Sequence, residues 1–373
     1  MTTASPSATA APLHWRQLAV GKSRITVVLP SRRDPRLKLS AVIVSLQVLG
    51  QTVLGFKVTI AQILVTVAVC AIIDMAVTLG RERILAWPAS GLLTGNSIAF
   101  ILRASGTRHG DWWSLHGIQY FLAAAVVALA SKHLIRPGGR HIFNPSNVGL
   151  IWVLLVIGPV RVFPQYLWWG PIGAPVVAAL VVIALGAVWV LRAVRMVPMA
   201  LSFLGPFAAL IAIFAASGQS FLATWHDGPV EGASYWLNIC ASPELLIFVF
   251  FMMSDPKTAP RGPVARLIFG ATTAVVAGAL VVFQPTEFGV KVAILASLTV
   301  GCALVPLIEA LGRRIQGAEP LSLWTRLPGT ARTSALLATA IIAAGAVVDT
   351  AVLAHNKDVT YIERGLTGAR NPQ

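Results

Sequence analysis

Three short polar clusters interrupt the apolar sequence and carry the side chains best suited to hold a ligand. They span residues 90–97, 140–149 and 253–261. Hydroxyl, amide and carboxylate groups at membrane depth are costly to bury, so they often mark a substrate or ion site. We expect six of these side chains to line such a site: Thr94, Asn96, Asn144, Asn147, Asp255 and Thr258. The alternative is that each cluster is a helix-end turn, with Asn144 capping a helix that starts at Pro145.

Two acidic side chains fall inside apolar segments. Asp74 lies about a turn and a half from one end of its segment, and Glu309 lies at the end of another. Both are candidates for an intramembrane role, because carboxylates are rare in lipid unless they have a function or a partner. The alternative is that each pairs with a nearby arginine, such as Arg81 or Arg313.

The sequence predicts neither catalytic residues nor a metal site. It contains no phosphate-binding glycine loop, no nucleophile elbow and no paired-histidine zinc motif. The three cysteines, Cys70, Cys240 and Cys302, lie tens of residues apart in or beside apolar segments. This spacing is typical of small core residues rather than of metal ligands. We therefore do not expect an enzyme that acts on its own.

The elements that position these residues must lie in a membrane. Of the 373 residues, 56% are hydrophobic and only 12% are charged, whereas soluble domains carry about 25% charged residues. The mean hydropathy is +0.76. Such a chain could not cover a soluble surface of this size with polar groups. The composition excludes a cytosolic enzyme, a disordered chain and a secreted disulfide scaffold, and it predicts a polytopic membrane protein in a lipid bilayer.

Eleven apolar segments approach or reach the ~20 residues that cross a bilayer. If the N-terminus is cytoplasmic and the segments alternate, 21 of the 29 Lys and Arg residues fall on the inner side. This is the expected positive-inside bias. The net charge of +15 is therefore a record of topology, and we expect no nucleic-acid partner. The segments are 39–56, 58–80, 88–102, 113–135, 145–160, 173–191, 197–217, 242–254, 266–284, 290–311 and 333–354.

Two of these segments are unusually short. Segments 88–102 and 242–254 would rise only about 22 and 20 Å as helices, and each is the third member of a group of five. Because five is odd, two successive five-helix groups have inverted orientations. Short segments at matching places in two such halves point to a site near the midplane. Gly91 and Gly95, one helical turn apart, allow another backbone to approach the first short segment closely.

The expected fold is an all-α polytopic membrane protein with two inverted five-helix repeats and an extra C-terminal transmembrane helix. The N-terminus would be cytoplasmic and the C-terminus external, in the cell membrane. The expected divisions are a basic cytoplasmic arm (1–38), the first repeat (39–160), an external connection (161–172), the second repeat (173–311), a cytoplasmic loop (312–332), the additional helix (333–354) and an external tail (355–373).

Five motifs, in this order, resemble the NqrB/RnfD family of membrane subunits. That family serves the sodium-pumping NADH:quinone oxidoreductase and the Rnf electron-transport complex. The resemblance covers roughly residues 36–315 and implies a fold of ten helices in two inverted repeats, similar to urea transporters. It also implies partner membrane subunits. The motifs are GLLTG at 91–95, FNPSNVG at 143–149, FMMSDPKT at 251–258, RLIFG at 266–270 and VPLIE at 305–309.

The sequence departs from this family at the flavin attachment site. Electron-carrying members bind FMN covalently through the threonine of an S-x-A-T motif in the connection between helices five and six. Here the connection 161–172 (RVFPQYLWWGPI) contains neither Ser nor Thr, so covalent FMN is not expected, and a non-covalent flavin is the alternative. The chain also resembles the UnbU-like branch of the family found in enediyne antibiotic clusters, which implies biosynthetic enzymes as partners.

Three functions follow from these observations. The first is transmembrane transport of a small molecule or ion through a midplane cavity, since the cavity motifs are retained while the flavin threonine is absent. The second is electron transport with a non-covalent flavin. The third is a membrane scaffold that recruits biosynthetic enzymes through the basic arm and the loop 312–332.

Overall fold

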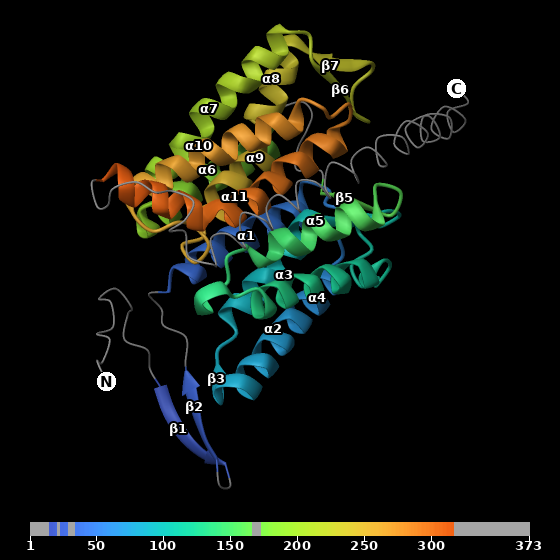
Figure 1. The fold of residues 1–373 in the computed structure, drawn as a ribbon. Helices are drawn as coiled ribbons and strands as arrows, with labels where there is room; N and C mark the ends of the chain where they lie inside the picture. Colours follow the sequence, from blue (N-terminus) through green and yellow to red (C-terminus); the bar gives the residue numbers. More distant parts are fainter. Residues whose placement is uncertain (1–14, 21–22, 29–33, 166–172, 317–373) are drawn as a thin grey trace.

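The structure, a computed structural model, describes residues 15–20, 23–28, 34–165 and 173–316, and it is largely helical (Figure 1). Most helices begin within a few residues of the predicted segments. Proline stands in the first turn of several of them, where its missing N–H group costs nothing. The helices are α1 (Pro35–Thr52), α2 (Ile60–Glu82), α3 (Ala89–Ile101), α4 (Ile118–Leu134), α5 (Pro145–Ile157), α6 (Ala174–Val194), α7 (Val197–Ala216), α8 (Gly232–Cys240), α9 (Pro243–Ile247), α10 (Pro263–Val281) and α11 (Glu287–Ile315), with a short 3₁₀ turn η1 (Pro137–Gly139) and a π-helical turn η2 (Phe248–Met252).

Six helical stretches within the described residues are long and apolar enough to cross a bilayer. This confirms the expectation of an α-helical membrane protein. Three further apolar helices are shorter: α3, α4 and α5. The predicted eleventh segment, 333–354, lies outside the described residues, as do the tail 355–373 and almost all of the loop 312–332. The six stretches are Ile60–Glu82, Ala174–Val194, Val197–Ala216, Gly232–Met252, Pro263–Val281 and Glu287–Ile315.

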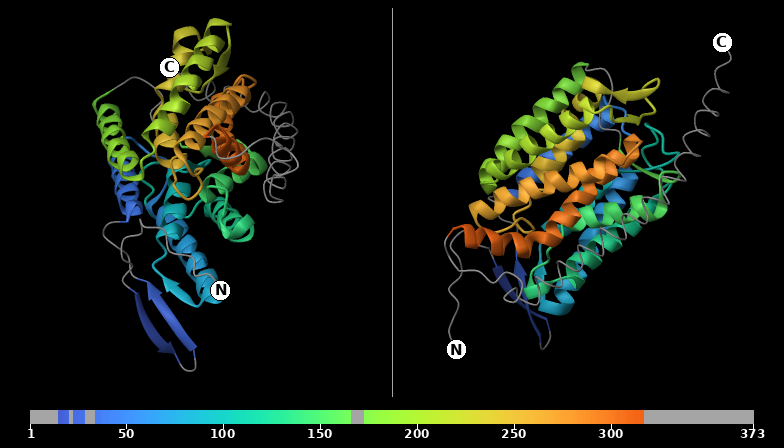
Figure 2. Two further views of the ribbon diagram at one scale, coloured as in Figure 1. Left: turned by 60° about the vertical axis from the view of Figure 1, so that its left-hand side comes forward. Right: turned by 45° about the horizontal axis from the view of Figure 1, so that its top comes forward.

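The helices pack in two groups that follow the order of the chain. In the first group α3 and α4 contact α2, and α5 contacts α4. In the second group α7 and α11 both contact α10, and α8 contacts α7. Contacts between α1 and α6 and between α5 and α11 join the two groups, as the two views of Figure 2 show. The α5–α11 contact carries part of the polar core described below.

The glycines of the GLLTG motif allow α3 to pack directly on α2. A Cβ atom added at Gly91 would lie 2.7 Å from the carbonyl oxygen of Cys70, and one added at Gly95 would lie 2.7 Å from the Cα of Val67. Those distances are too short for any larger residue. The close approach expected from these two glycines is therefore confirmed.

The structure adds short strands and one helix that the sequence analysis did not expect. In the arm, β1 (Trp15–Val20) pairs antiparallel with β2 (Ser23–Val28), and β2 pairs parallel with β3 (Ile84–Ala86). Two-stranded pairs form between β4 (Leu102–Ala104) and β5 (Val162–Pro164), and between β6 (Ser220–Leu222) and β7 (Pro229–Glu231). Helix α8 lies in the segment 218–241, which was expected to be an external loop.

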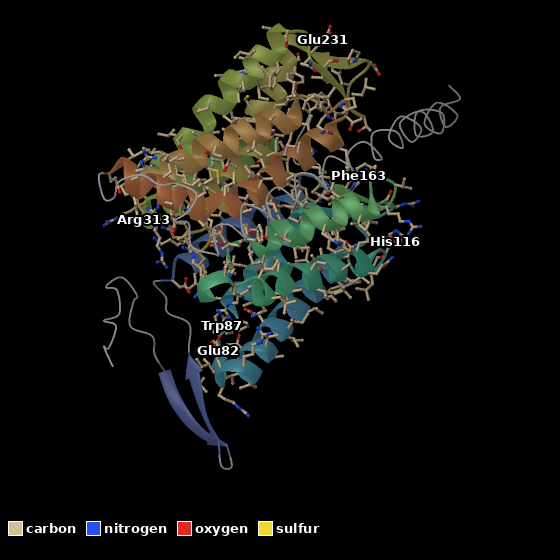
Figure 3. The ribbon with its side chains drawn as sticks, in the orientation of Figure 1. Glu82, Trp87, His116, Phe163, Glu231 and Arg313 are labelled. Atoms are coloured by element: carbon tan, nitrogen blue, oxygen red, sulfur yellow. The ribbon has the colours of Figure 1, made fainter. Side chains whose placement is uncertain are left out.

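Two ends of the bundle can be distinguished by their charges. Figure 3 shows Glu82, Trp87 and Arg313 at one end, which we call the basic end, and His116, Phe163 and Glu231 at the other, which we call the opposite end. Helix α3 starts at the basic end, whereas α9 starts at the opposite end and runs through η2 to the turn 253–262. The sites described below lie at the basic end.

Candidate functional site: a cationic pocket at the basic end

The three polar clusters of the sequence meet at the basic end. The guanidinium of Arg140, in the second cluster, donates from Nε to the carbonyl oxygen of Lys257 and from Nη2 to that of Ala259, both at 2.7 Å. The side-chain amide of Asn144 donates to the carbonyl oxygen of Met252 at 3.2 Å. These hydrogen bonds fix the second cluster to the third across more than 100 residues of sequence. The first cluster joins them at a pocket.

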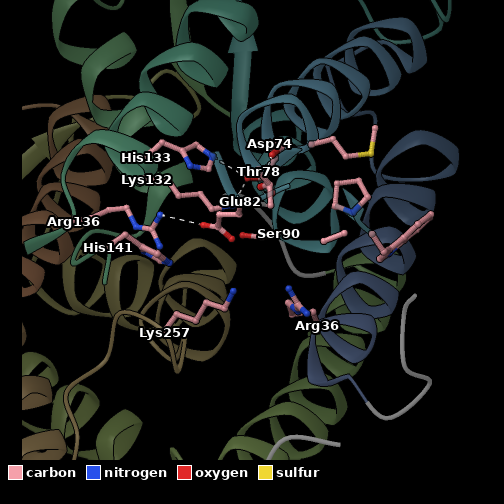
Figure 4. A pocket seen from close by; sticks show the side chains of 14 residues that line it. Arg36, Asp74, Thr78, Glu82, Ser90, Lys132, His133, Arg136, His141 and Lys257 are labelled. Atoms are coloured by element: carbon pink, nitrogen blue, oxygen red, sulfur yellow. Dashed lines mark hydrogen bonds and ion pairs between the residues drawn. The ribbon is translucent and has the colours of Figure 1, made fainter. Parts of the chain in front are cut away.

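This pocket, which we call the cationic pocket, has a volume of about 220 Å³. It collects side chains from α1, α2, α4, the start of α3 and the loops that precede α5 and α10 (Figure 4). Each polar cluster supplies at least one lining residue: Ser90 from the first, His141 from the second and Lys257 from the third. The other lining residues are Arg36, Asp74, Met75, Thr78, Glu82, Ala86, Trp87, Pro88, Lys132, His133 and Arg136.

Asp74 is held in the pocket wall by two partners from α4. Its Oδ1 accepts from the ammonium of Lys132 at 2.5 Å and lies 3.0 Å from Nε2 of His133. All three side chains are at least 88% buried. The predicted partner Arg81 instead donates to the backbone carbonyl of His133. A buried carboxylate of this kind needs such a partner, because desolvation opposes its charge.

The remaining charges of the pocket also form pairs, with one exception. Arg136 lies 3.8 Å from Glu82, and Arg36 forms a bidentate pair with Asp34. No carboxylate of the described residues lies within ion-pairing distance of the ammonium of Lys257. Figure 4 shows Lys257 and Arg36 across the pocket from Asp74, Lys132 and His133. Asp34 lies outside the lining, and once it is counted with Arg36, one positive charge of the pocket remains in excess, on Lys257.

Two further properties favour an anion beside Lys257. Desolvation in the pocket, together with the positive charges of Arg36 and Lys132, lowers the pKa of Lys257; a bound anion would relieve part of that penalty. The lining residue Pro88 directly precedes helix α3 at the N-cap position and supplies no side-chain cap. The partial positive charge of that helix N-terminus adds to the field of the lysine.

Asn144 and Asn147 lie beside the pocket in the polar contact between the two helix groups. Asn144 caps α5, as expected, by accepting from the backbone N–H of Asn147. The side-chain amide of Asn147 donates to the carbonyl oxygen of Leu295 and to Oγ1 of Thr299, both at 2.9 Å. These two asparagines connect α5 with η2 and α11. They do not line the cationic pocket.

The other four predicted site residues also lie outside the pocket lining. Thr94 donates to the carbonyl oxygen of Ser90 in its own helix, and Asn96 is buried on α3. Asp255 accepts from the backbone N–H of Lys257 at 3.0 Å. Thr258 is buried in the same turn, which these contacts hold in shape. Asp255 thereby positions the residue that carries the pocket's excess charge.

Glu309 fixes this turn from α11. Its Oε1 accepts from the backbone N–H of Arg261 at 2.8 Å and lies 3.7 Å from the guanidinium of Arg140. Pairing of Glu309 with an arginine was one of the two alternatives expected from the sequence. The partner is Arg140 rather than Arg313. Glu309 is therefore part of the loop network around Lys257.

Sequence reasoning missed five charged or titratable lining residues: Arg36, Glu82, Lys132, His133 and Arg136. Three of them, Arg36, Lys132 and Arg136, were interpreted as part of the positive-inside charge bias. His133 was interpreted as one of several scattered histidines. The signal that could have found them is their position, since each lies within two turns of a segment end on the side where the first and third clusters also lie. Only Asp74 was both predicted and found in the lining.

No family model matches the chain, and no curated protein sequence matches it. Within the described residues no group of three His, Cys, Asp or Glu side chains could hold a metal ion. Of the connection 161–172, residues 166–172 lie outside the described residues.

Proposed function

We propose that this protein is a membrane transport protein that takes up a small anion into the cationic pocket at its basic end. The observation that carries the proposal is the ammonium of Lys257, which lies in a pocket whose other charges are paired. A cation inside a pocket, without a carboxylate partner among the described residues, is the arrangement that electrostatic recognition of an anion requires. The long apolar helices place this pocket in a membrane protein.

The interrupted helices support transport over simple binding. Helix α3 has 13 residues, and α9 with η2 has 10 residues before the chain turns. Taken alone, neither would cross ~30 Å of hydrocarbon, although α9 and η2 follow α8 in the stretch Gly232–Met252, which as a whole is long enough. They start from opposite ends of the bundle, and π-helical turns such as η2 are frequent at functional sites. Broken helices whose N-termini face a charged ligand are a common feature of secondary transporters.

We propose further that the two helix groups are inverted repeats of the NqrB/RnfD type. In this interpretation α1 to α5 correspond to α6, α7, α9 with η2, α10 and α11. The contact of α4 with α5 would then match that of α10 with α11, and the contact of α2 with α4 would match that of α7 with α10. The charge bias of the sequence would place the basic end and its pocket in the cytoplasm.

The proposal is tested with the full chain reconstituted in liposomes. Uptake of three labelled probes is measured: inorganic phosphate, succinate and FMN. We expect saturable uptake of at least one probe, lost when Lys257 is replaced by glutamine. Uptake no greater than that of protein-free liposomes for every probe, with correctly inserted protein, would reject transport of small anions.

Electron transport with a non-covalent flavin is the second candidate. Trp87 and Met75 line the same pocket as the cations, and an aromatic ring beside positive charges suits a phosphorylated aromatic ligand such as FMN. The absorption spectrum of gently purified protein separates the two functions. A stoichiometric flavin band would favour electron transport, and protein without that band but with anion uptake would favour transport.

A further inference from the structure

The surface formed by α1 and α6 ends in a cluster of positive charges at the basic end. The ammonium of Lys38, near the start of α1, lies 5.3 Å from the centre of the indole ring of Trp189 on α6. Arg192 follows about one turn after Trp189, in the last turn of α6, and Arg195 ends the helix. The carbonyl oxygen of Arg195 accepts from Nη1 of Arg266, near the start of α10. Three cations of α1 and α6 therefore gather where these helices reach the basic end.

The three cations Lys38, Arg192 and Arg195 form no ion pair with a carboxylate in the part of the chain that the structure describes. Asp34, the acidic residue closest to Lys38 in the sequence, is held by its bidentate pair with Arg36. The side chains of Arg192 and Arg195 are exposed, and that of Lys38 is half-buried. Exposed cations that lie together without acidic neighbours attract an anionic group.

Trp189 indicates the depth of this cluster in the membrane. Tryptophan is enriched at membrane–water interfaces, where its ring lies at the level of the lipid headgroups. The ring of Trp189 is half exposed and lies five residues before the end of α6. The cation–π contact holds the ammonium of Lys38 beside that ring, while the lysine stem can lie along apolar surface. The cations are therefore placed at headgroup level.

An apolar stripe leads from this cluster towards the centre of the bilayer. On α6 the exposed apolar side chains recur every three or four residues between Val177 and Trp189, a rise of about 18 Å. This length matches one leaflet, about half of the ~30 Å of hydrocarbon. Helix α1 packs against α6 and exposes apolar side chains of its own, as the left view of Figure 2 helps to show. The stripe consists of Val44 and Val48 on α1 and Val177, Val181, Leu185 and Val188 on α6.

We propose that this surface, which we call the α1–α6 lipid site, binds an anionic phospholipid. Arg192 offers the planar guanidinium that suits bidentate hydrogen bonds to a phosphate, and Lys38 adds a point charge. The apolar stripe receives the acyl chains. A zwitterionic lipid offers the same chains, but the positive group of its headgroup opposes the cations. Basic sites between transmembrane helices are suited to anionic headgroups for this reason.

A lipid at this site would act on the contact that joins the two helix groups, since α1 belongs to one group and α6 to the other. The site is separate from the cationic pocket, because neither Lys38, Trp189 nor Arg192 lines that pocket. Lipid binding therefore does not depend on the proposed anion transport, and failure of anion uptake would leave it unaffected.

The test uses the purified full chain in mixed micelles with equal amounts of phosphatidylglycerol and phosphatidylcholine. Bromine is placed on the acyl chains of one lipid at a time, because brominated chains quench tryptophan fluorescence on contact. We expect stronger quenching when phosphatidylglycerol carries the bromine. Trp189→Phe should remove most of this difference, because the other tryptophans are not part of the site. Equal quenching by the two brominated lipids in the wild type would overturn the proposal.

Charge variants identify the headgroup contacts. A basic residue near an anionic membrane surface contributes about fivefold in lipid affinity, so Lys38→Gln and Arg192→Gln should each lower the preference for phosphatidylglycerol about fivefold. Arg313→Gln is the matched control, since it removes an exposed positive charge from α11 at the same end, and it should leave the preference unchanged.

Two results with these variants would also reject the site. The first is a preference that persists in both Lys38→Gln and Arg192→Gln. The second is an absence of quenching of Trp189 by either lipid, which would show that a second copy of the chain or another protein covers the surface. If a charge variant does not fold, the comparison of the wild type with Trp189→Phe still decides the question.

Discussion

Replacing Lys257 by glutamine removes the excess positive charge of the cationic pocket while leaving its other ion pairs intact. The ammonium is the lining cation that forms no ion pair with a carboxylate in the described part of the chain, so its loss breaks no ion pair. Part of the lysine side chain is solvent-exposed, so we expect little effect on folding. Asp255 still accepts the backbone N–H of residue 257 and keeps the turn in place.

The size of the pocket sets the size of the effect. A sphere of 220 Å³ has a radius of about 4 Å, so a bound anion would lie roughly 5 Å from a lining ammonium. The Coulomb energy at that distance is about 3 kcal/mol at an effective dielectric constant of ~20, and about 1 kcal/mol in water. These values correspond to roughly 150-fold and 5-fold in Kd. Because solvent enters the pocket, we predict that Lys257→Gln weakens anion binding about tenfold.

The assay is titration of each purified variant with inorganic phosphate, succinate or FMN, whichever the wild type binds. Arg313→Gln is the matched control, since it removes one exposed positive charge at the same end but outside the pocket. It should change Kd by less than about twofold, and its small effect should vanish at high salt because exposed charges are screened. Equal losses in the two variants would show that the general charge of the basic end, rather than the pocket, attracts the anion.

Three further predictions concern the pocket and the helix contacts. Gly149→Ala should destabilise the protein by about 1–3 kcal/mol in a denaturant titration, because the new Cβ would overlap the carbonyl oxygen of Ala124. Gly80→Ala is the control: a Cβ at Gly80 meets no other atom, so this variant should not be destabilised. Asn147→Ala removes two hydrogen bonds to α11 and should lower the free energy of unfolding by about 1–2 kcal/mol. The measurement is a denaturant titration in mixed micelles, and an unchanged unfolding midpoint would refute the role of this contact. Burial lowers the pKa of His141, so the folded protein takes up this proton only below about pH 6.5. Anion affinity should rise below that pH and the rise should be lost in His141→Gln, while stability should fall in the same range because the unfolded chain protonates first.

The sequence predicted the helices well because their signals are local. Long apolar stretches and prolines in first turns placed α2, α3, α5 and α10 to within a few residues. The cap at Asn144 and the close approach at Gly91 are also set by residues that lie next to one another in sequence. The strands β3 to β7 have only three residues each, too few for an alternating pattern to be visible. Helix α8 was missed because it is flanked by polar, glycine-bearing sequence.

The cationic pocket could not be predicted from local sequence signals, because its lining residues are far apart in the chain. Arg36 and Lys257 are separated by more than 200 residues, and the packing of the helices brings them into one pocket. A basic residue at a segment end has the same appearance in sequence whether it faces lipid headgroups or a pocket. Each polar cluster contributes a residue to the pocket, whereas most of its charged side chains come from α1, α2 and α4.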